Sequence, residues 1–170
     1  CNPGTAACVH LATLDQSFNG MTLVPAGPID PYRDILVGIA NSGSWYRVDI
    51  TGEAAASLTP IGAYGSGYTS SGDAYSIDGV GTYGATDKSG VTGGDVIVEA
   101  DPTTGAVLSD IGVTTGYYSL YGLAGTTDTI FGFDASGAVI SIDPISGVTD
   151  LIASTGHAWW GAGVTTRNSK

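Results

Sequence analysis

The feature that most constrains the fold of this chain is an internal repeat. The stretch YSIDGV (residues 75–80) recurs 43 residues later as YSLYGL (residues 118–123). A second stretch occurs three times, as VGIANSG (37–43), YGATDKSG (83–90) and FGFDASG (131–137). Each copy is rich in β-branched and aromatic residues and is bounded by Gly, Asp or Ser, which is the pattern of short strands separated by turns.

A third repeated stretch carries the strongest turn signal. It reads WYRVDITG (45–52), VIVEADPTTG (96–105) and VISIDPISG (139–147), and short apolar stretches follow at 56–61, 106–111 and 148–153. In Asp-Pro-x-x-Gly, the proline presets the φ angle of a type I turn, the aspartate accepts backbone hydrogen bonds, and the glycine takes the left-handed position. We therefore expect a tight hairpin between the third and fourth strands of each unit.

Four antiparallel strands in each unit of about 43 residues are typical of the blade of a β-propeller. The sequence therefore predicts an all-β protein built from β-propeller blades of four antiparallel strands. Three full blades begin near Met21, Tyr75 and Tyr118, and extra terminal strands flank them. Residues 9–14 would be the last strand of a preceding blade, and residues 159–164 would be the first strand of a following one.

The turn sequences resemble a known group of proteins. The runs DPTTG (101–105) and YGLA (121–124) are similar to bacterial extracellular β-propeller repeats of the PQQ-like, NHL-like and YVTN-like kind. The resemblance covers residues 20–166 and implies their architecture. It implies no activity, because such propellers carry many unrelated activities. Around these blades we expect an N-terminal segment (1–19), with the two cysteines and a closing strand, and a C-terminal tail (167–170).

Three blades are fewer than the roughly four to eight that close a propeller ring. A chain of three blades leaves sheet edges and apolar blade faces that need cover. We therefore expect self-association, or a longer propeller of which this chain is a part. Lysine and arginine together number only 5, and a shortage of lysine removes a common protection of edge strands.

The charge balance excludes some classes of partner. With 16 acidic residues the net charge is −11, and so few cationic side chains cannot follow a phosphate backbone, which excludes a nucleic-acid binder.

No apolar run reaches the length of about 18 residues that a membrane helix needs, so no membrane span is predicted. A long helical bundle is also excluded, because the chain holds 27 glycines and glycine disfavours helices.

The two cysteines, Cys1 and Cys8, lie close together in the sequence. A local disulfide between them fits a secreted protein. The alternative is a lipid-modified Cys1 like that of bacterial lipoproteins, which would leave Cys8 unpaired. We expect the disulfide, and a secreted or cell-surface location.

A candidate ligand site follows from the propeller geometry, in which the first strand of each blade lines a central channel. Aromatic side chains with a carboxylate and a histidine at the channel mouth suit a glycan or another small polar ligand. The candidates are Tyr75, Asp78, Tyr118, Tyr121, His157, Trp159 and Trp160. Asp78, Tyr121 and Trp160 each precede a glycine and are expected at equivalent positions. The alternative is that these side chains pack between blades, because alternate residues of a strand face opposite sides.

Signals for catalysis are weak in this sequence. His10 and His157 lie in no zinc-binding pattern, and no Gly-x-Ser-x-Gly motif occurs. Each turn carries one acid, which favours turn capping over calcium, an ion that needs about six to eight oxygen ligands. We therefore expect no metal site and no cofactor, with calcium as the weaker alternative.

These observations predict an extracellular or cell-surface binding or assembly module that is not an enzyme. Two alternatives stay open. One is a carbohydrate-binding, lectin-like or carbohydrate-active propeller, and the other is a structural subunit of a surface layer or filament.

Overall fold

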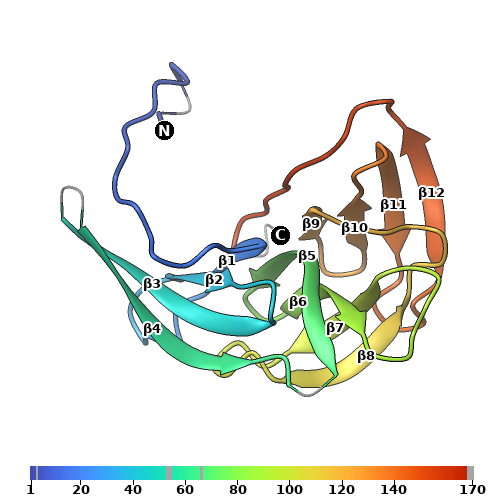
Figure 1. Ribbon diagram of the computed structural model, residues 1–170, viewed down its shortest axis with the longest axis horizontal. Helices are drawn as coiled ribbons and strands as arrows, with labels where there is room; N and C mark the ends of the chain where they lie inside the picture. The colour runs from blue at the N-terminus through green and yellow to red at the C-terminus, as the bar shows by residue number, and fades with distance from the viewer. Residues whose placement is uncertain (3, 53–54, 66, 168–170) are drawn as a thin grey trace.

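The computed structural model describes residues 1–2, 4–52, 55–65 and 67–167, and these residues form twelve β-strands. The strands make three antiparallel sheets of four strands, each a meander in chain order (Figure 1). Sheet 1 comprises β1 (Gly20–Val24), β2 (Ile35–Ile39), β3 (Ser44–Gly52) and β4 (Ala55–Ala63). Sheet 2 comprises β5 (Tyr68–Ile77), β6 (Gly81–Lys88), β7 (Val96–Ala100) and β8 (Val107–Val113). Sheet 3 comprises β9 (Gly122–Gly125), β10 (Ile130–Phe133), β11 (Ala138–Ile142) and β12 (Thr149–Ser154). The predicted all-β class with three four-stranded units is confirmed.

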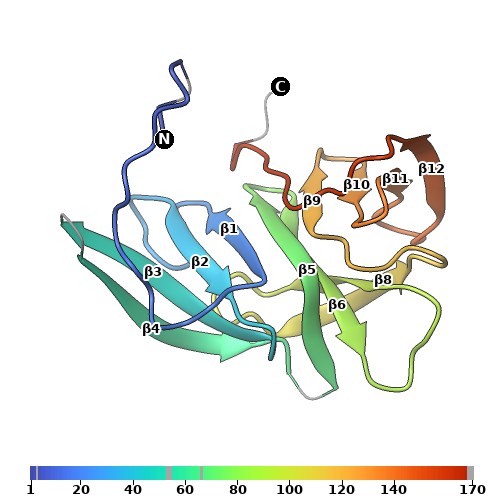
Figure 2. The same ribbon diagram turned by 45° about the horizontal axis from the view of Figure 1, so that its top comes forward.

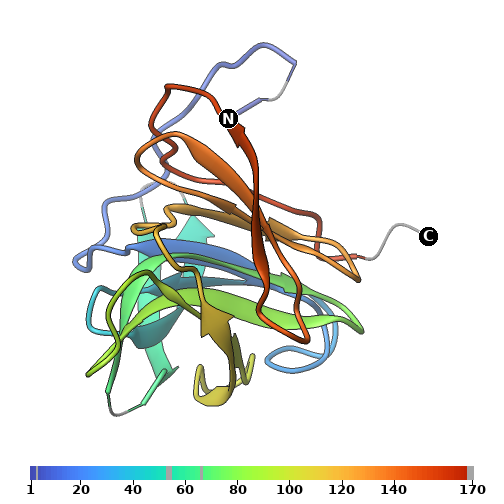
Figure 3. The ribbon, with the colours of Figure 1, turned by 90° about the vertical axis from the view of Figure 1, so that its right-hand side faces the viewer.

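The first strands of the three sheets are neighbours in space. β1 packs against β5, and β5 packs against β9, while β4, β8 and β12 lie on the periphery (Figure 1). The sheets therefore fan out in an arc that is open on one side. The side view in Figure 3 shows the twist of the strands, which follows from the preferred twist of L-amino-acid backbones.

Strand register identifies the equivalent positions of the three sheets. A glycine of each second strand pairs with the first strand: Gly38 with Met21, Gly84 with Ala74, and Gly132 with Leu123. Met21, Ala74 and Leu123 are therefore equivalent. The sequence repeat that aligns Tyr75 with Tyr118 is not a structural equivalence, because Tyr75 lies within β5 whereas Tyr118 precedes β9.

Two apolar clusters join neighbouring sheets. Trp45 of sheet 1 and Val98 of sheet 2 belong to one cluster, and Ile97 of sheet 2 and Ile140 of sheet 3 belong to the other. The consecutive residues Ile97 and Val98 of β7 thus belong to different clusters, because successive side chains of a strand point to opposite faces of the sheet. Burying one such side chain stabilises the fold by about 1.5–3 kcal/mol, so sheet 2, which is covered on both faces, holds the arc together.

The Asp-Pro-x-x-Gly runs form the predicted hairpin turns. The amide of Gly105 donates to the carbonyl of Asp101 at 2.7 Å, and Gly147 does the same to Asp143 at 2.9 Å. Both glycines have positive φ angles, 73° and 71°, which glycine adopts without a steric penalty. The hydroxyl and amide of Thr103 donate to the Asp101 carboxylate and hold the pKa of that group below its ordinary value.

The two predicted terminal strands do not form. Residues 9–14 have no strand structure and stand away from the sheets (Figure 2), so they lie beside no strand edge with which they could pair. Residues 159–164 belong to an extended segment, the C-terminal strap (residues 155–167), which crosses the open side of the arc (Figure 1). A segment that crosses other strands, instead of running beside one, cannot form a ladder of backbone hydrogen bonds.

The N-terminal segment contains the predicted disulfide between Cys1 and Cys8. The amide of Asn2 donates to the carbonyl of Ala7 at 2.8 Å across the loop. The alternative of a lipid on Cys1 needs a free sulfur at that residue, and in this structure the sulfur is bonded to Cys8.

Within the described residues, no helix has the length and apolar character to cross a membrane. Of the predicted C-terminal tail, residues 168–170 lie outside the described part of the chain.

Candidate functional site

An open pocket of about 440 Å³ lies at one end of the inner strands. Its lining is mostly amide, hydroxyl and carboxylate groups, with two tyrosines. The lining residues are Asn19, Asn41, Thr69, Ser70, Ser71, Asp87, Asp95, Tyr118, Ser119 and Tyr121. Two of the seven predicted ligand residues, Tyr118 and Tyr121, are therefore part of one pocket.

Segments that lead into the three inner strands bring these side chains together. Asn19 precedes β1, and Ser70 and Ser71 lie near the start of β5. The Asn19 side-chain amide donates to the Ser70 carbonyl at 3.0 Å, which ties sheet 1 to sheet 2 at the pocket. The Ser70 amide in turn donates to the Asn41 carbonyl at 3.1 Å.

The buried carboxylate of Asp95 shapes the loop of residues 118–121. Its two oxygens accept hydrogen bonds from the amides of Ser119 (3.1 Å) and Leu120 (2.9 Å). Ser119 has a φ angle of 53°, an uncommon conformation for a residue other than glycine, and such residues cluster at functional sites. Burial raises the pKa of Asp95, and the Leu120 amide partly offsets this effect.

Gly72 lets this loop approach β5 closely. A Cβ atom at Gly72 would lie 1.9 Å from the carbonyl oxygen of Leu120. The adjacent amide of Asp73 donates to that same oxygen at 3.0 Å. The position of the tyrosine-bearing loop thus depends on a residue without a side chain in the neighbouring strand.

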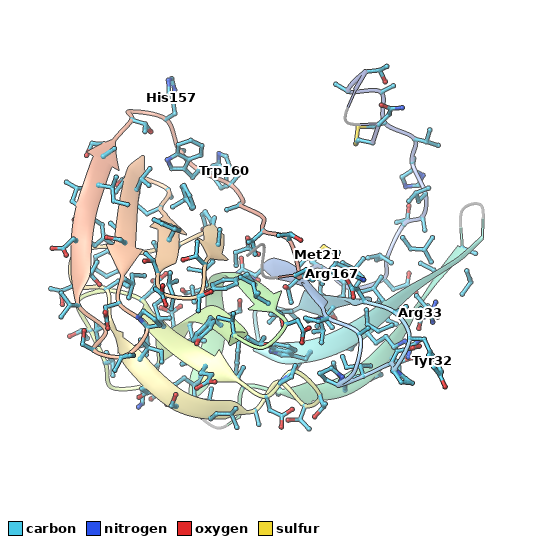
Figure 4. All side chains as sticks on the ribbon, turned by 180° about the vertical axis from the view of Figure 1, so that it is seen from behind. Met21, Tyr32, Arg33, His157, Trp160 and Arg167 are labelled. Carbon is cyan, nitrogen blue, oxygen red and sulfur yellow. A yellow bond between two sulfur atoms is a disulfide. The ribbon has the colours of Figure 1, made fainter. Side chains whose placement is uncertain are left out.

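The aromatic side of the pocket is accessible from solvent. Tyr118 is 55% exposed. Tyr121 stacks on Trp160 of the C-terminal strap, with ring centroids 5.2 Å apart and an angle of 11° between the planes. Trp160 is 77% exposed, and Figure 4 shows it on the segment that follows β12. Three of the predicted ligand residues are therefore gathered at one place.

The remaining predicted residues lie elsewhere. Tyr75 is buried and stacks on Tyr83 in the core (5.4 Å between centroids), so a ligand in the pocket cannot reach it. Asp78 lies in the turn between β5 and β6, at the far end of β5 from the pocket. It is therefore not equivalent to Tyr121, which immediately precedes β9.

The other two predicted residues lie on the C-terminal strap. His157 is exposed and points away from the sheets (Figure 4). Trp159 packs edge-on against Phe133 of β10, with centroids 5.5 Å apart. Neither residue lines the pocket described above.

The sequence analysis missed Asp73, a buried carboxylate near the inner ends of the three sheets. Asp73 accepts hydrogen bonds from the amide of Met21 in β1 (3.3 Å) and from that of Ala162 in the C-terminal strap (3.4 Å). Burial raises the pKa of Asp73, and its backbone hydrogen bonds partly offset this. The signal in the sequence was an acid inside an otherwise uncharged strand.

The electrostatics of the pocket restrict its ligands. The lining contains the carboxylates of Asp87 and Asp95 and neither lysine nor arginine. An anionic ligand would meet repulsion without a compensating cation, whereas hydroxyl groups of a neutral ligand can donate to these acceptors. Among the described residues, no group of three or more His, Cys, Asp or Glu side chains is arranged to hold a metal ion.

A scan against protein-family models and a search of curated proteins find no match to this chain. The function must therefore be argued from the geometry and chemistry of the pocket.

Proposed function

We propose that the three sheets are blades of a β-propeller and that the chain is an extracellular or cell-surface module that binds neutral glycans. The observation that carries the glycan proposal is the pairing of two tyrosines, the exposed Tyr118 and the partly exposed Tyr121, with a lining of amides, hydroxyls and carboxylates. Sugars present apolar ring faces that stack on aromatic side chains, and hydroxyl groups that both donate and accept hydrogen bonds.

The propeller proposal is supported by the order of the strands. Each sheet is a four-stranded meander, and its first strand lies beside the first strand of the next sheet. This is the arrangement of propeller blades around an axis. In that arrangement the pocket lies where segments leading into consecutive inner strands meet, so one ligand contacts two or three blades.

Binding, rather than catalysis, is the activity proposed. The buried acid of the pocket, Asp95, already accepts two backbone amides of the loop that it positions. Its role in the proposal is therefore to hold Tyr118 and Tyr121 in place. Asp87 is exposed and offers a carboxylate to ligand hydroxyl groups.

Isothermal titration calorimetry with glucose, mannose, galactose and N-acetylglucosamine, and with short oligomers of each, tests the proposal. We expect at least one of these to bind, and Tyr118→Ala or Tyr121→Ala to weaken binding by about fivefold or more, as is typical of an aromatic residue at a binding centre. Trp160→Ala should weaken binding through the loss of its stacking on Tyr121.

Tyr32→Ala is the matched control. Tyr32 is an exposed tyrosine outside the pocket, 92% exposed against 55% for Tyr118, and Figure 4 shows it at the other end of the arc from Trp160. Its replacement should leave the affinity unchanged. Absence of heat with every neutral sugar, or tighter binding of sulfated or carboxylated glycans, would contradict the proposal.

A further inference from the structure

Sheets 1 and 3 each have one face that no other sheet covers, and strand register identifies what that face corresponds to in sheet 2. Toward sheet 1, sheet 2 presents Ala74, Gly84, Val98 and Ala100. By register, the equivalent positions of sheet 1 are Met21, Gly38, Tyr46 and Val48. These four residues define the face of sheet 1 that no other sheet covers, called here the uncovered face of sheet 1. Met21 is exposed and Tyr46 is partly exposed, whereas Gly38 and Val48 are buried, and the ring of Phe18 lies against Gly38 and Tyr46.

The same comparison applies at the other end of the arc. Toward sheet 3, sheet 2 presents Tyr75, Tyr83, Ala85 and Ile97. Their equivalents in sheet 3 are Ala124, Phe131, Phe133 and Val139. These four residues define the uncovered face of sheet 3, and all of them are partly exposed.

The two uncovered faces repeat the surfaces that already pack together inside the chain. Sheet 2 has two packed surfaces, one against sheet 1 and one against sheet 3. The uncovered face of sheet 3 is equivalent to the surface with which sheet 2 packs on sheet 3. The uncovered face of sheet 1 is equivalent to the surface with which sheet 2 packs on sheet 1. We propose that the uncovered face of sheet 3 packs against the uncovered face of sheet 1 in a second copy of this chain, and that two copies close a ring of six sheets.

Details of both faces agree with this pairing. A Cβ atom at Gly38 would lie 2.6 Å from the ring of Phe18, so this ring lies directly over Gly38. Leu120 lies over Gly132 in sheet 3, where a Cβ atom would be 3.2 Å from its side chain. Leu120 is fully buried between two sheets, whereas Phe18 is only half-buried. Phe18 therefore has the position of an interface residue whose neighbouring sheet is missing.

The contact of Trp159 with Phe133 has a similar counterpart. Tyr64, which follows the last strand of sheet 1, packs edge-on against Trp45 with centroids 5.5 Å apart, and sheet 2 buries both rings. Trp159 follows the last strand of sheet 3 and packs edge-on against Phe133 at the same separation. Trp159 is only half-buried, so this contact also lacks its covering sheet.

The number of copies follows from the number of sheets. Propellers close with about four to eight blades, and six is the only multiple of three in that range. The contact is head to tail, and in a ring of two copies it is made twice, which leaves no face uncovered. The proposal rests on the propeller assignment for the count of six, and it does not depend on the glycan pocket.

Sedimentation equilibrium and light scattering of the chain at micromolar to submillimolar concentration test the proposal. The single chain has a mass of 17.0 kDa, and we expect twice that mass. A mass of one chain at every concentration overturns the proposal, and so does a mass above two chains.

Charge substitutions on each face test the head-to-tail geometry. Met21→Lys and Phe131→Lys should each yield monomers, and an equimolar mixture of the two should recover a dimer through the one contact in which both faces are intact. If only one of the two variants is monomeric, the dimer is made by the same face of both copies and not by two different faces. That result overturns the proposal.

Ile145→Lys is the matched control, because Ile145 is 93% exposed in the turn between β11 and β12, away from both uncovered faces. It should remain dimeric. If circular dichroism shows that Met21→Lys or Phe131→Lys does not fold, Tyr46→Lys or Val139→Lys replaces it. The monomeric Phe131→Lys variant should still bind glycan, so failure of the ring and failure of the pocket are measured separately.

Discussion

The middle sheet and the two outer sheets are built on the same strand pattern, yet they differ in how much of that pattern is buried. Ile97 in β7 and Val139 in β11 occupy equivalent positions by register. Ile97 is fully buried because sheet 3 covers it, whereas Val139 is partly exposed because no sheet follows. Burial at equivalent positions is therefore decided by the neighbouring sheet, and the local sequence alone does not determine it.

The largest expected effect is on the middle sheet. Replacing Ile97 with alanine leaves a cavity between sheets 2 and 3 and should lower the free energy of unfolding by about 2–5 kcal/mol. Urea denaturation measures this loss as a lower midpoint with an unchanged m-value. A loss below about 1 kcal/mol would mean that the two sheets are not closely packed at this site.

The equivalent change in the outer sheet sharpens the comparison. Val139→Ala should lower the free energy of unfolding by roughly 1 kcal/mol or less when the chain is a dilute monomer, because the side chain is already partly in water. The same measurement at high concentration should show a larger loss if a second copy covers this face. Equal losses for Ile97→Ala and Val139→Ala in dilute solution would contradict the comparison.

A smaller, pH-dependent effect is expected in the turn of the middle sheet. Because hydrogen bonds lower the pKa of Asp101 in the folded state, its contribution is complete above the pKa of the unfolded chain and is lost as the pH falls through the lowered folded value. Asp101→Ala should therefore decrease the Tm at pH 7, by less than Ile97→Ala does.

The difference between Asp101→Ala and the parent chain should shrink as the pH falls below about 4, the ordinary pKa of an aspartate, and should vanish once the carboxyl is protonated in both states. Thermal unfolding followed by circular dichroism at a series of pH values measures this trend. A difference that grows toward low pH would show that the carboxylate does not stabilise the turn.

The smallest effect is expected at the N-terminal segment. The Cys1–Cys8 disulfide closes a short loop of exposed residues that precedes sheet 1 and lies away from its strands (Figure 2). Reduction should change the Tm of the sheets by less than about 2 °C, which for a chain of this size is under ~1 kcal/mol. A matched sample with alkylated cysteines separates the loss of the bond from any effect of the reductant. A large decrease in Tm would show that the loop packs on the sheets.

Sequence reasoning succeeded where the determinants are local. The turns at Asp101 and Asp143 depend on proline, aspartate and glycine within five residues, so their hairpins follow directly from the sequence. The three units of four strands follow from such turns and from the apolar stretches between them. The disulfide was predicted from the closeness of two cysteines along the chain.

Sequence reasoning failed where the outcome depends on distant neighbours. Residues 159–164 have the composition of a strand, but a strand needs a parallel or antiparallel edge beside it, and no sequence pattern shows whether one is there. Tyr75 and Tyr118 are similar in sequence context, yet β5 is ten residues long and β9 is four. Strand register separates the two tyrosines: Ala74 and Leu123 are equivalent, so Tyr75 lies one residue after this position within β5, whereas Tyr118 lies five residues before it, outside β9.

The C-terminal strap has a consequence for the order in which the chain can fold. The hydroxyl of Thr166 donates to the carboxylate of Asp34 at 2.7 Å, a contact that joins positions 132 residues apart in the sequence. The sheets can therefore assemble in order from the first to the third as their strands are synthesised, whereas the strap can dock across them only after all three sheets have been synthesised.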